Sequence, residues 1–264
     1  MKTQQEKGTA FRALHAGEPF VIPNPWDAGS ARVLEALGFQ ALATTSSGFA
    51  FALGKLDGET TMDEVGAHVA SLAAATDLPI SVDLENGHGP SPEDAAQAIR
   101  AVADAGAVGG SIEDWDREGY LYEVGLATER IRAAAEAARA LPFPFTLTAR
   151  AENYLRGNPD LDDTIARLQA YESAGADVVY APRLADLQDL RTLCQAVSRP
   201  VNVLAMPGIS MADLIEVGAQ RVSVGGRLTW VAAKALADAA MAIRDHGDFS
   251  SMAASVPLEE WFGG

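Results

Sequence analysis

Two carboxylates, Asp83 and Glu85, stand two residues apart at the end of an apolar segment, 79–82, and a Gly-His-Gly turn follows at 87–89. Side chains at positions i and i+2 of a strand point to the same side, so these two acids are expected to lie together. Two clustered carboxylates repel each other unless a cation or a shared proton relieves them. Oxygen-only clusters suit hard divalent ions, Mg²⁺ above all where a substrate completes the ligand set. The spacing therefore indicates a metal site, although acidic residues at strand ends also commonly cap the next helix.

The elements that must position these acids alternate regularly along the chain. Short β-type runs are expected at 19–23, 41–45, 79–83, 109–113, 145–149, 177–181, 201–205 and 220–224. Ala-rich segments with helical periodicity lie between them, for example at 28–37, 61–76, 91–105, 128–140, 160–174 and 184–196. Eight such β/α units predict an α/β protein with a (β/α)₈ TIM barrel as one domain over residues 1–264, with 245–264 as a C-terminal tail.

Length, charge and cysteine content limit the classes of function. The chain has 264 residues, close to the roughly 250 typical of such a barrel. A formal net charge of −16 argues against nucleic acid and anionic membranes as partners, because both require a basic face. The single cysteine, Cys194, cannot form an internal disulfide, and no apolar run reaches the roughly 18 residues of a membrane span. The polar segment 1–8 lacks the apolar core of a signal peptide. A cytoplasmic location is therefore expected.

Polar residues follow several of the expected strands, at the face where the chemistry of a barrel takes place. Strand 1 is followed by 24–27 (Asn-Pro-Trp-Asp) and strand 2 by small residues at 44–48, whose backbone N–H groups suit an anion. The remaining ends carry acids and one arginine, namely Asp57, Asp83, Glu85, Glu113 and Arg150. A cation between the four acids and an anionic substrate against Arg150 would balance these charges.

The chain resembles the isocitrate lyase / phosphoenolpyruvate mutase superfamily at seven short motifs, in order along nearly the whole chain. These are Ser46-Ser47-Gly48, Leu53-Gly54-Lys55-Leu56-Asp57, Asp83-Leu84-Glu85-Asn86-Gly87, Ser111-Ile112-Glu113-Asp114, Thr148-Ala149-Arg150, Pro200-Val201-Asn202-Val203-Leu204 and Val222-Ser223-Val224-Gly225-Gly226. The resemblance implies a (β/α)₈ barrel of the phosphoenolpyruvate mutase type, with the last helix exchanged between subunits of a homodimer or homotetramer. It also implies a small-molecule substrate, a 2-oxo acid or its enolate, and bond making or breaking between two carbons or between phosphorus and carbon.

The resemblance also implies roles for individual residues. Asp83 corresponds to the direct ligand of Mg²⁺, with Mn²⁺ as a substitute, and Asp57, Glu85 and Glu113 hold the ion through water. Arg150 faces the oxo-acid end of the substrate, and the other residues expected to bind substrate or line the mouth are Trp26, Asp27, Ser46, Ser47, Gly48 and Asn202. The expected catalytic residues are Arg150, Asp57, Glu113 and His88. His88 is a candidate proton donor, with a turn residue that makes a capping bond as the alternative.

One segment departs from the lyase branch of this superfamily. That branch carries a Lys-Lys/Arg-Cys-Gly-His segment on a mobile loop after strand 4, whereas residues 115–123 here read Trp-Asp-Arg-Glu-Gly-Tyr-Leu-Tyr-Glu, without cysteine. A retro-aldol cleavage needs a positioned base and acid, while loss of CO₂ from a β-carboxylated 2-oxo acid needs an electron sink and a later proton. The interpretation favoured is decarboxylation of an oxaloacetate-like substrate.

Three alternatives stay open. One is a phosphonopyruvate-type hydrolase or mutase, for which the glycines of 224–227 would offer a phosphate cradle. Another is a lyase of the isocitrate or methylisocitrate type. The third is of a different class, a non-catalytic protein that binds a 2-oxo acid.

Overall fold

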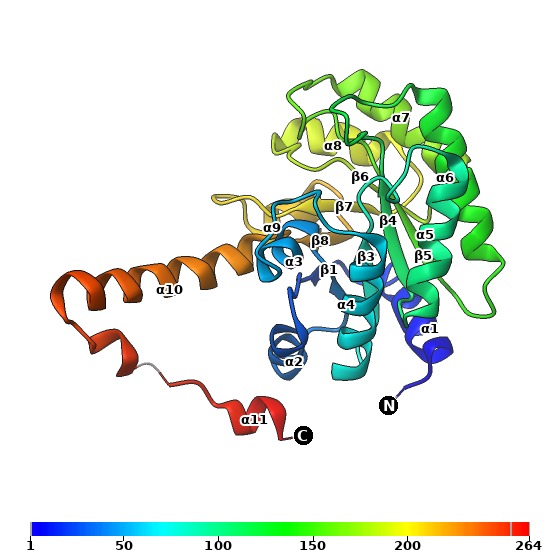
Figure 1. The fold of residues 1–264 in the computed structure, drawn as a ribbon. Helices are drawn as coiled ribbons and strands as arrows, with labels where there is room; N and C mark the ends of the chain where they lie inside the picture. Colours follow the sequence, from blue (N-terminus) through cyan, green and yellow to red (C-terminus); the bar gives the residue numbers. More distant parts are fainter. Residues whose placement is uncertain (1, 254, 264) are drawn as a thin grey trace.

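Eight parallel strands form the centre of the computed structural model, which describes residues 2–253 and 255–263 (Figure 1). Their order is β1-β8-β7-β6-β5-β4-β3-β2, and the backbone N–H of Ala43 donates to Pro23 O at 3.0 Å across the remaining gap between β2 and β1. The strands are β1 (Phe20–Ile22), β2 (Leu42–Ala43), β3 (Ile80–Asp83), β4 (Gly109–Glu113), β5 (Thr146–Arg150), β6 (Val178–Tyr180), β7 (Val201–Leu204) and β8 (Arg221–Ser223). The predicted TIM barrel is confirmed, and each strand falls within or one residue beyond its expected range.

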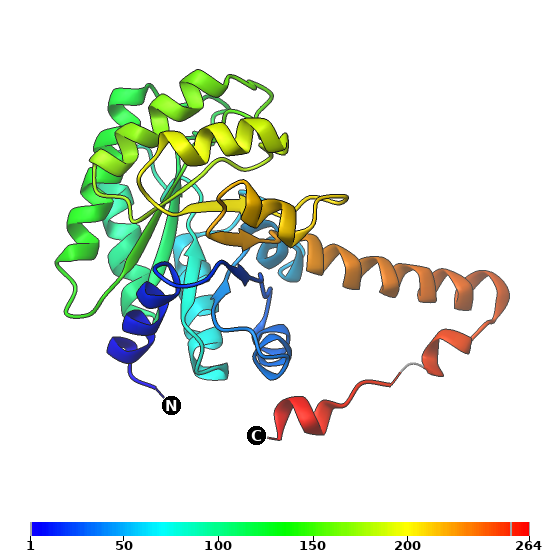
Figure 2. The same cartoon turned by 180° about the vertical axis from the view of Figure 1, so that it is seen from behind.

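Helices surround the strands, most of them at the places that the periodicity predicts (Figures 1 and 2). They are α1 (Gln4–Leu14), α2 (Ala28–Ala36), α3 (Ser46–Ala52), α4 (Met62–Ala75), α5 (Pro92–Asp104), α6 (Val124–Arg139), α7 (Leu161–Ser173), α8 (Leu187–Ala196), α9 (Met211–Glu216) and α10 (Arg227–His246), followed by the 3₁₀ helix η1 (Ser250–Ala253) and α11 (Leu258–Phe262). Many begin at a side-chain cap, as α4 and α5 do with reciprocal Thr61/Glu64 and Ser91/Asp94 bonds. Such caps satisfy N–H groups that the first turn leaves unpaired.

Helix α1 is packed against one end of the barrel interior. Phe11 is fully buried and clusters with Phe20, Ile22 and Val108. Gly109 leaves room for it, because a Cβ there would lie 2.8 Å from the Phe11 ring. Burial of a phenylalanine of this kind is worth roughly 2–3 kcal/mol. The opposite, carboxyl end of the strands remains available for a cavity.

Helix α10 extends away from the barrel, and the chain then turns back through η1 to α11 (Figures 1 and 2). α11 packs on α2, where Arg32 donates to Phe262 O at 2.5 Å and its guanidinium lies over the Phe262 ring. Thr229 is the one buried residue of α10, and several large apolar side chains along α10 and the tail are exposed: Trp230, Val231, Leu236, Met241, Phe249, Met252, Val256 and Leu258. No helix in the described part of the chain is long and apolar enough to cross a membrane.

Candidate functional site

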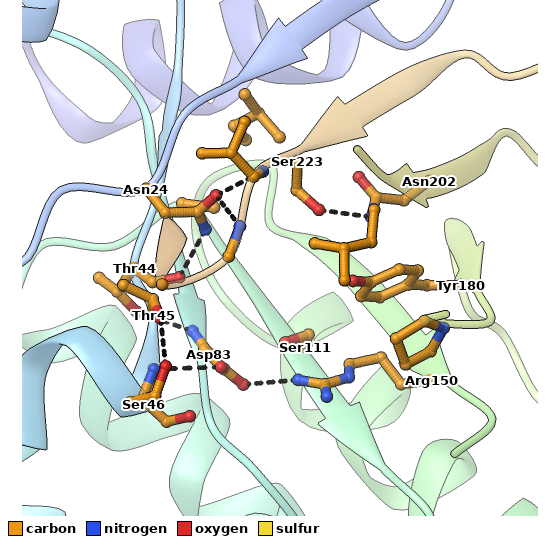
Figure 3. Close-up of a pocket in the computed structure, with 18 of the residues that line it drawn as sticks. Asn24, Thr44, Thr45, Ser46, Asp83, Ser111, Arg150, Tyr180, Asn202 and Ser223 are labelled. Atoms are coloured by element: carbon orange, nitrogen blue, oxygen red, sulfur yellow. Dashed lines mark hydrogen bonds and ion pairs between the residues drawn. The ribbon is translucent and has the colours of Figure 1, made fainter. Parts of the chain in front are cut away.

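Two adjoining cavities open at the carboxyl ends of the strands. The first, the central cavity, has a volume of about 430 Å³ and is lined by residues from every strand or from the segment that follows it; Figure 3 shows its polar centre. The second, of about 440 Å³, shares Ser46, Asp57, Arg150 and Leu155 with it. The lining of both cavities contains unusual polar residues at this face of the barrel, as we expected from the sequence.

Arg150 joins the acidic residues of the two cavities into one network. Its Nη1 donates to Asp83 Oδ1 at 2.9 Å (Figure 3). Its Nη2 lies 3.0 Å from Glu113 Oε2 and 2.8 Å from Glu152 Oε1. β4 and β5 place Glu113 opposite Arg150 in register, so the pairing follows from the sheet itself. Burial opposes the charge of Arg150, but these three carboxylates outweigh it and raise the pKa of the guanidinium well above its ordinary value.

Three acids at this site hold their protons more tightly than they would in water. Burial raises the pKa of Asp57, and the neighbouring Asp83 adds to the rise. Burial also raises the pKa of Glu85, against the opposing charge of Arg117, which lies 3.1 Å away. Glu113 is raised well above its ordinary value by burial and then by Glu152.

The charge of this cluster favours a cation. Five carboxylates (Asp57, Asp83, Glu85, Glu113 and Glu152) face three arginines (Arg117, Arg150 and Arg156). Across the described residues, no three His, Cys, Asp or Glu side chains converge closely enough to ligate one ion together. Such a set of carboxylates would suit a hydrated ion that contacts one of them and reaches the others through water, which is the manner of binding that Mg²⁺ prefers.

The small residues after β2 form the first turn of a helix. Thr45 caps α3, and the backbone N–H of Ser46 donates to Asp83 Oδ2 at 3.2 Å (Figure 3). The hydroxyl of Thr44 accepts from the backbone N–H of Asp83 at 2.8 Å, which fixes the carboxylate beside the helix. Ser46 and Ser47 line the central cavity, whereas Gly48 packs behind them. A Cβ on Gly48 would lie 2.6 Å from Thr229 Oγ1, so Gly48 serves the packing of α3 on α10.

Three further residues expected at the site lie outside both cavities. Asp27 is exposed and caps α2 by accepting from the Ser30 N–H at 2.7 Å, and Trp26 lies beside Gly48. His88 adopts a left-handed conformation with φ of 59°, and its Nδ1 lies 2.9 Å from Arg117 Nη2. Burial and then Arg117 lower the pKa of His88 to about 4, so it is neutral at pH 7.

Asn202 lines the central cavity, but both ends of its amide are engaged. Its Nδ2 donates to Ser223 Oγ at 3.0 Å (Figure 3), and its Oδ1 accepts from Arg221 Nε at 2.7 Å. Arg221 is buried, and its other recorded partners, Thr148 Oγ1 and His15 Nε2, are neutral. Burial therefore lowers its pKa to about 10.

Sequence reasoning missed Tyr180, Arg221 and Arg156. Tyr180 ends β6 and lines the central cavity, and its position at a strand terminus was the available signal. Arg221 begins β8 at the opposite strand end, where no chemistry is expected. Arg156 lies over the Trp115 ring and pairs with Glu113 and Glu152, contacts between loops that no local pattern indicates.

The fold and the site together define a (β/α)₈ barrel with a cluster of carboxylates bridged by Arg150 at the carboxyl ends of its strands. A family profile described as phosphoenolpyruvate phosphomutase matches residues 11–244. The chain belongs to this family, within the phosphoenolpyruvate mutase/isocitrate lyase superfamily of lyases, mutases and hydrolases. The expected superfamily membership is thereby confirmed.

Similar proteins span the range of that superfamily. An uncharacterized protein of Mycobacterium tuberculosis is 37% identical over 249 residues, which cover 93% of this chain and 92% of that protein. The 2-methylisocitrate lyase of Halalkalibacterium halodurans is 28% identical (93% and 85% covered), and the oxaloacetate decarboxylase of Rhodopseudomonas palustris is 29% identical (84% and 78% covered). A crystal structure from Burkholderia cenocepacia, named a lyase/mutase, is 50% identical with a TM-score of 0.95 and covers 99% of this chain and 97% of its own.

Proposed function

We propose that this protein is a Mg²⁺-dependent carbon–carbon lyase that decarboxylates an oxaloacetate-like 2-oxo acid through its enolate. The observation that carries the proposal is a pair of adjoining cavities in which acids and arginines meet and whose described lining residues include no thiol. The chain's one cysteine, Cys194, lies in α8 beside Gly218, and burial raises its pKa to about 11. In the loop that follows β4, where the lyase branch carries its cysteine, Arg117 donates a hydrogen bond to Glu85. A decarboxylation suits such a site, because it needs no base to remove a hydroxyl proton.

In this proposal Asp83 holds the ion directly, and Asp57, Glu85 and Glu113 hold it through water. When bound, the ion acts as a Lewis acid that stabilises the negative charge developing on the 2-oxo oxygen as the carboxylate leaves. Arg150 orients the oxo-acid end of the substrate, and its three carboxylate partners fix its guanidinium in place. Ser46 and Ser47, which line the central cavity, receive the substrate carboxylate. Arg117 offsets part of the rise that burial causes in the pKa of Glu85.

The test is turnover of oxaloacetate by the purified protein with Mg²⁺ or Mn²⁺, beside isocitrate, methylisocitrate and phosphonopyruvate. We expect pyruvate release well above the background rate of the free metal, abolished by EDTA and restored by added Mg²⁺. Arg150→Ala is expected to lower kcat/KM at least 100-fold, since it removes the group that orients the oxo acid. Unchanged activity with EDTA would overturn the metal assignment.

The alternatives predict other outcomes of the same assay. Turnover of methylisocitrate would favour the lyase reading, which the similarity to 2-methylisocitrate lyases supports. Turnover of phosphonopyruvate would favour P–C chemistry. Against a phosphate cradle at 224–227, the N–H groups of Val224 and Gly225 already donate to Asn24 Oδ1, each at 2.9 Å. Binding of 2-oxo acids with no turnover of any of the four would indicate a non-catalytic binding protein.

A further inference from the structure

Loss of CO₂ leaves an enolate whose C3 must gain one proton, and Tyr180 is placed to supply it. The described residues that line the central cavity include no cysteine, histidine or lysine. Its acids, Asp57 and Asp83, belong to the proposed metal cluster, and the guanidinium of Arg221 is engaged by Asn202, Thr148 and His15. Tyr180 is the tyrosine of this lining, and its phenol carries a proton that can be transferred.

The fold places Tyr180 beside the residue that orients the substrate. It ends β6, in register with Arg150 of β5 and Asn202 of β7. The Arg150 guanidinium carbon lies 5.5 Å from the centroid of the Tyr180 ring. In Figure 3 the ring lies between Arg150 and the Asn202–Ser223 pair, with its hydroxyl end toward the interior of the cavity. Tyr180 is also buried.

The surroundings of Tyr180 suit a proton donor. Burial raises the pKa of its phenol to about 12, while Arg150 and the Ser223 side chain lower it in part. The phenol therefore carries its proton at pH 7. The same two neighbours stabilise the phenolate that forms once the proton has left, because a cation near an anion favours the charged form.

We propose that Tyr180 is the acid that protonates C3 of the enolate, an inference that rests on the proposed decarboxylation. The C3–C4 bond breaks, CO₂ leaves, and the bonding electron pair stays in the enolate. The O–H bond of Tyr180 then breaks as the new C3–H bond forms, which gives pyruvate and a phenolate. Water entering the cavity returns one proton to the phenolate and completes the cycle.

The experiment compares Tyr180→Phe with wild type and with Tyr154→Phe. Tyr154 is a partly buried tyrosine that lines neither cavity, so its variant makes the same chemical change elsewhere. CO₂ release and pyruvate formation are followed together, with the enol detected by its ultraviolet absorbance. In wild type, and likewise in Tyr154→Phe, we expect pyruvate to form at the same rate as CO₂ is released. In Tyr180→Phe, kcat for pyruvate is expected to fall 10²- to 10⁴-fold, as for other lost general acids, with KM within about threefold and free enol accumulating.

A second measurement separates failure of Tyr180 from failure of the proposed function. Exchange of the methyl protons of pyruvate in D₂O, followed by NMR with Mg²⁺ present, passes through the same enolate but requires no decarboxylation. Exchange by wild type that is lost in Tyr180→Phe supports the donor even if oxaloacetate is not turned over. Wild-type rates of both reactions in a folded Tyr180→Phe variant would overturn the donor and leave the decarboxylase standing. A wild type inert in both assays would overturn both.

Discussion

Asp83 is the carboxylate of the cavity that accepts hydrogen bonds from three separate donors. It accepts from Arg150, from the backbone N–H of Ser46 and from the backbone N–H of Glu85. The three donors come from β5, from the first turn of α3 and from the segment after β3, so Asp83 lies at the centre of the acidic cluster. This position makes Asp83 the carboxylate best placed to contact a cation directly.

Asp83→Asn is accordingly expected to reduce Mg²⁺-dependent turnover at least 100-fold with little change in fold. The amide keeps the shape of the carboxylate but loses the charge that a metal ion requires. Steady-state rates across a Mg²⁺ titration measure this, with circular dichroism as the check on folding. Asp104→Asn, at the exposed end of α5, is the control and should behave as wild type. Full activity of Asp83→Asn at ordinary Mg²⁺ concentration would show that another group holds the ion.

His68 predicts a pH dependence of stability. It is buried in α4, stacks on Phe49 with ring centroids 4.0 Å apart, and its Nε2 has no hydrogen-bond partner. Burial lowers its pKa from 6.5 to about 4, so the unfolded chain binds the proton more readily than the folded one. Its contribution to stability is therefore complete above pH 6.5 and is lost as the pH falls from 6.5 to 4, by about 2 kcal/mol between pH 7.5 and 5.

Urea unfolding at those two pH values tests this expectation. His68→Leu removes the titrating group, and its loss of stability between pH 7.5 and 5 should be smaller than that of wild type by about 2 kcal/mol. The other three histidines are present in both proteins and cancel in the comparison. An equal loss in the two proteins would mean that His68 is protonated in the folded state without cost.

At the scale of elements, α3 links the cavity to α10. Its first turn contacts Asp83 through Ser46, while Gly48 on its other side packs against Thr229 and Trp26. The sequence indicated a loop of small residues here, because seven residues are too few for a reliable helical periodicity. The packing of α10 beside these residues, which only the tertiary structure shows, explains why they are small.

Gly48→Ala is expected to destabilise the protein by about 1–3 kcal/mol, since the added methyl would lie 2.6 Å from Thr229 Oγ1. Gly66→Ala in the middle of α4 meets nothing within 4 Å and is expected to stabilise by about 0.5–1 kcal/mol through helix propensity. Chemical denaturation of the two variants measures both changes in the free energy of unfolding, the loss for Gly48→Ala and the gain for Gly66→Ala. A stabilising Gly48→Ala would show that α3 is free to shift away from α10.

The eight strands illustrate what local pattern predicts well at this scale. Parallel strands in a barrel are buried on both faces, so they appear as short apolar runs bounded by turn residues, and such runs identify them without any knowledge of their partners. This reasoning from local pattern does not predict the short helices α3 and α9. Their residues are fixed by neighbours that are distant along the chain.

At the scale of the whole molecule, α10 is the helix whose apolar side chains most need a partner to bury them. It is 20 residues long and exposes apolar side chains along much of its length. A single subunit leaves these side chains in water, and exposed apolar patches of this extent are typical of interaction surfaces. This arrangement agrees with the expectation of a homodimer or homotetramer in which the last helix packs on a second subunit.

Light scattering coupled to size-exclusion chromatography tests this expectation. Wild type should elute as a dimer or tetramer, and Leu236→Glu should shift it toward smaller species, because a carboxylate cannot be buried in an apolar interface without large cost. Asp238→Asn, two residues along the same helix, should leave the assembly unchanged. A monomeric wild type at micromolar concentration would overturn the oligomer.

The sequence by itself determined the barrel, the superfamily and the acids at the carboxyl ends of the strands. These depend on periodicity and on side chains that directly follow a strand, both of which are local properties. The loss of the thiol from the loop after β4 was likewise visible in the residues alone.

Only the tertiary structure decided which of these residues face one another. It placed Trp26, Asp27, Gly48 and His88 outside the cavities and brought Tyr180 and Arg221 into the lining. Strand tilt and helix packing set these directions, because a side chain at a strand terminus points into the cavity or behind it according to contacts made by distant elements. The charge balance around Arg150 follows from the same contacts, since its partners come from β3, β4 and the segment after β5.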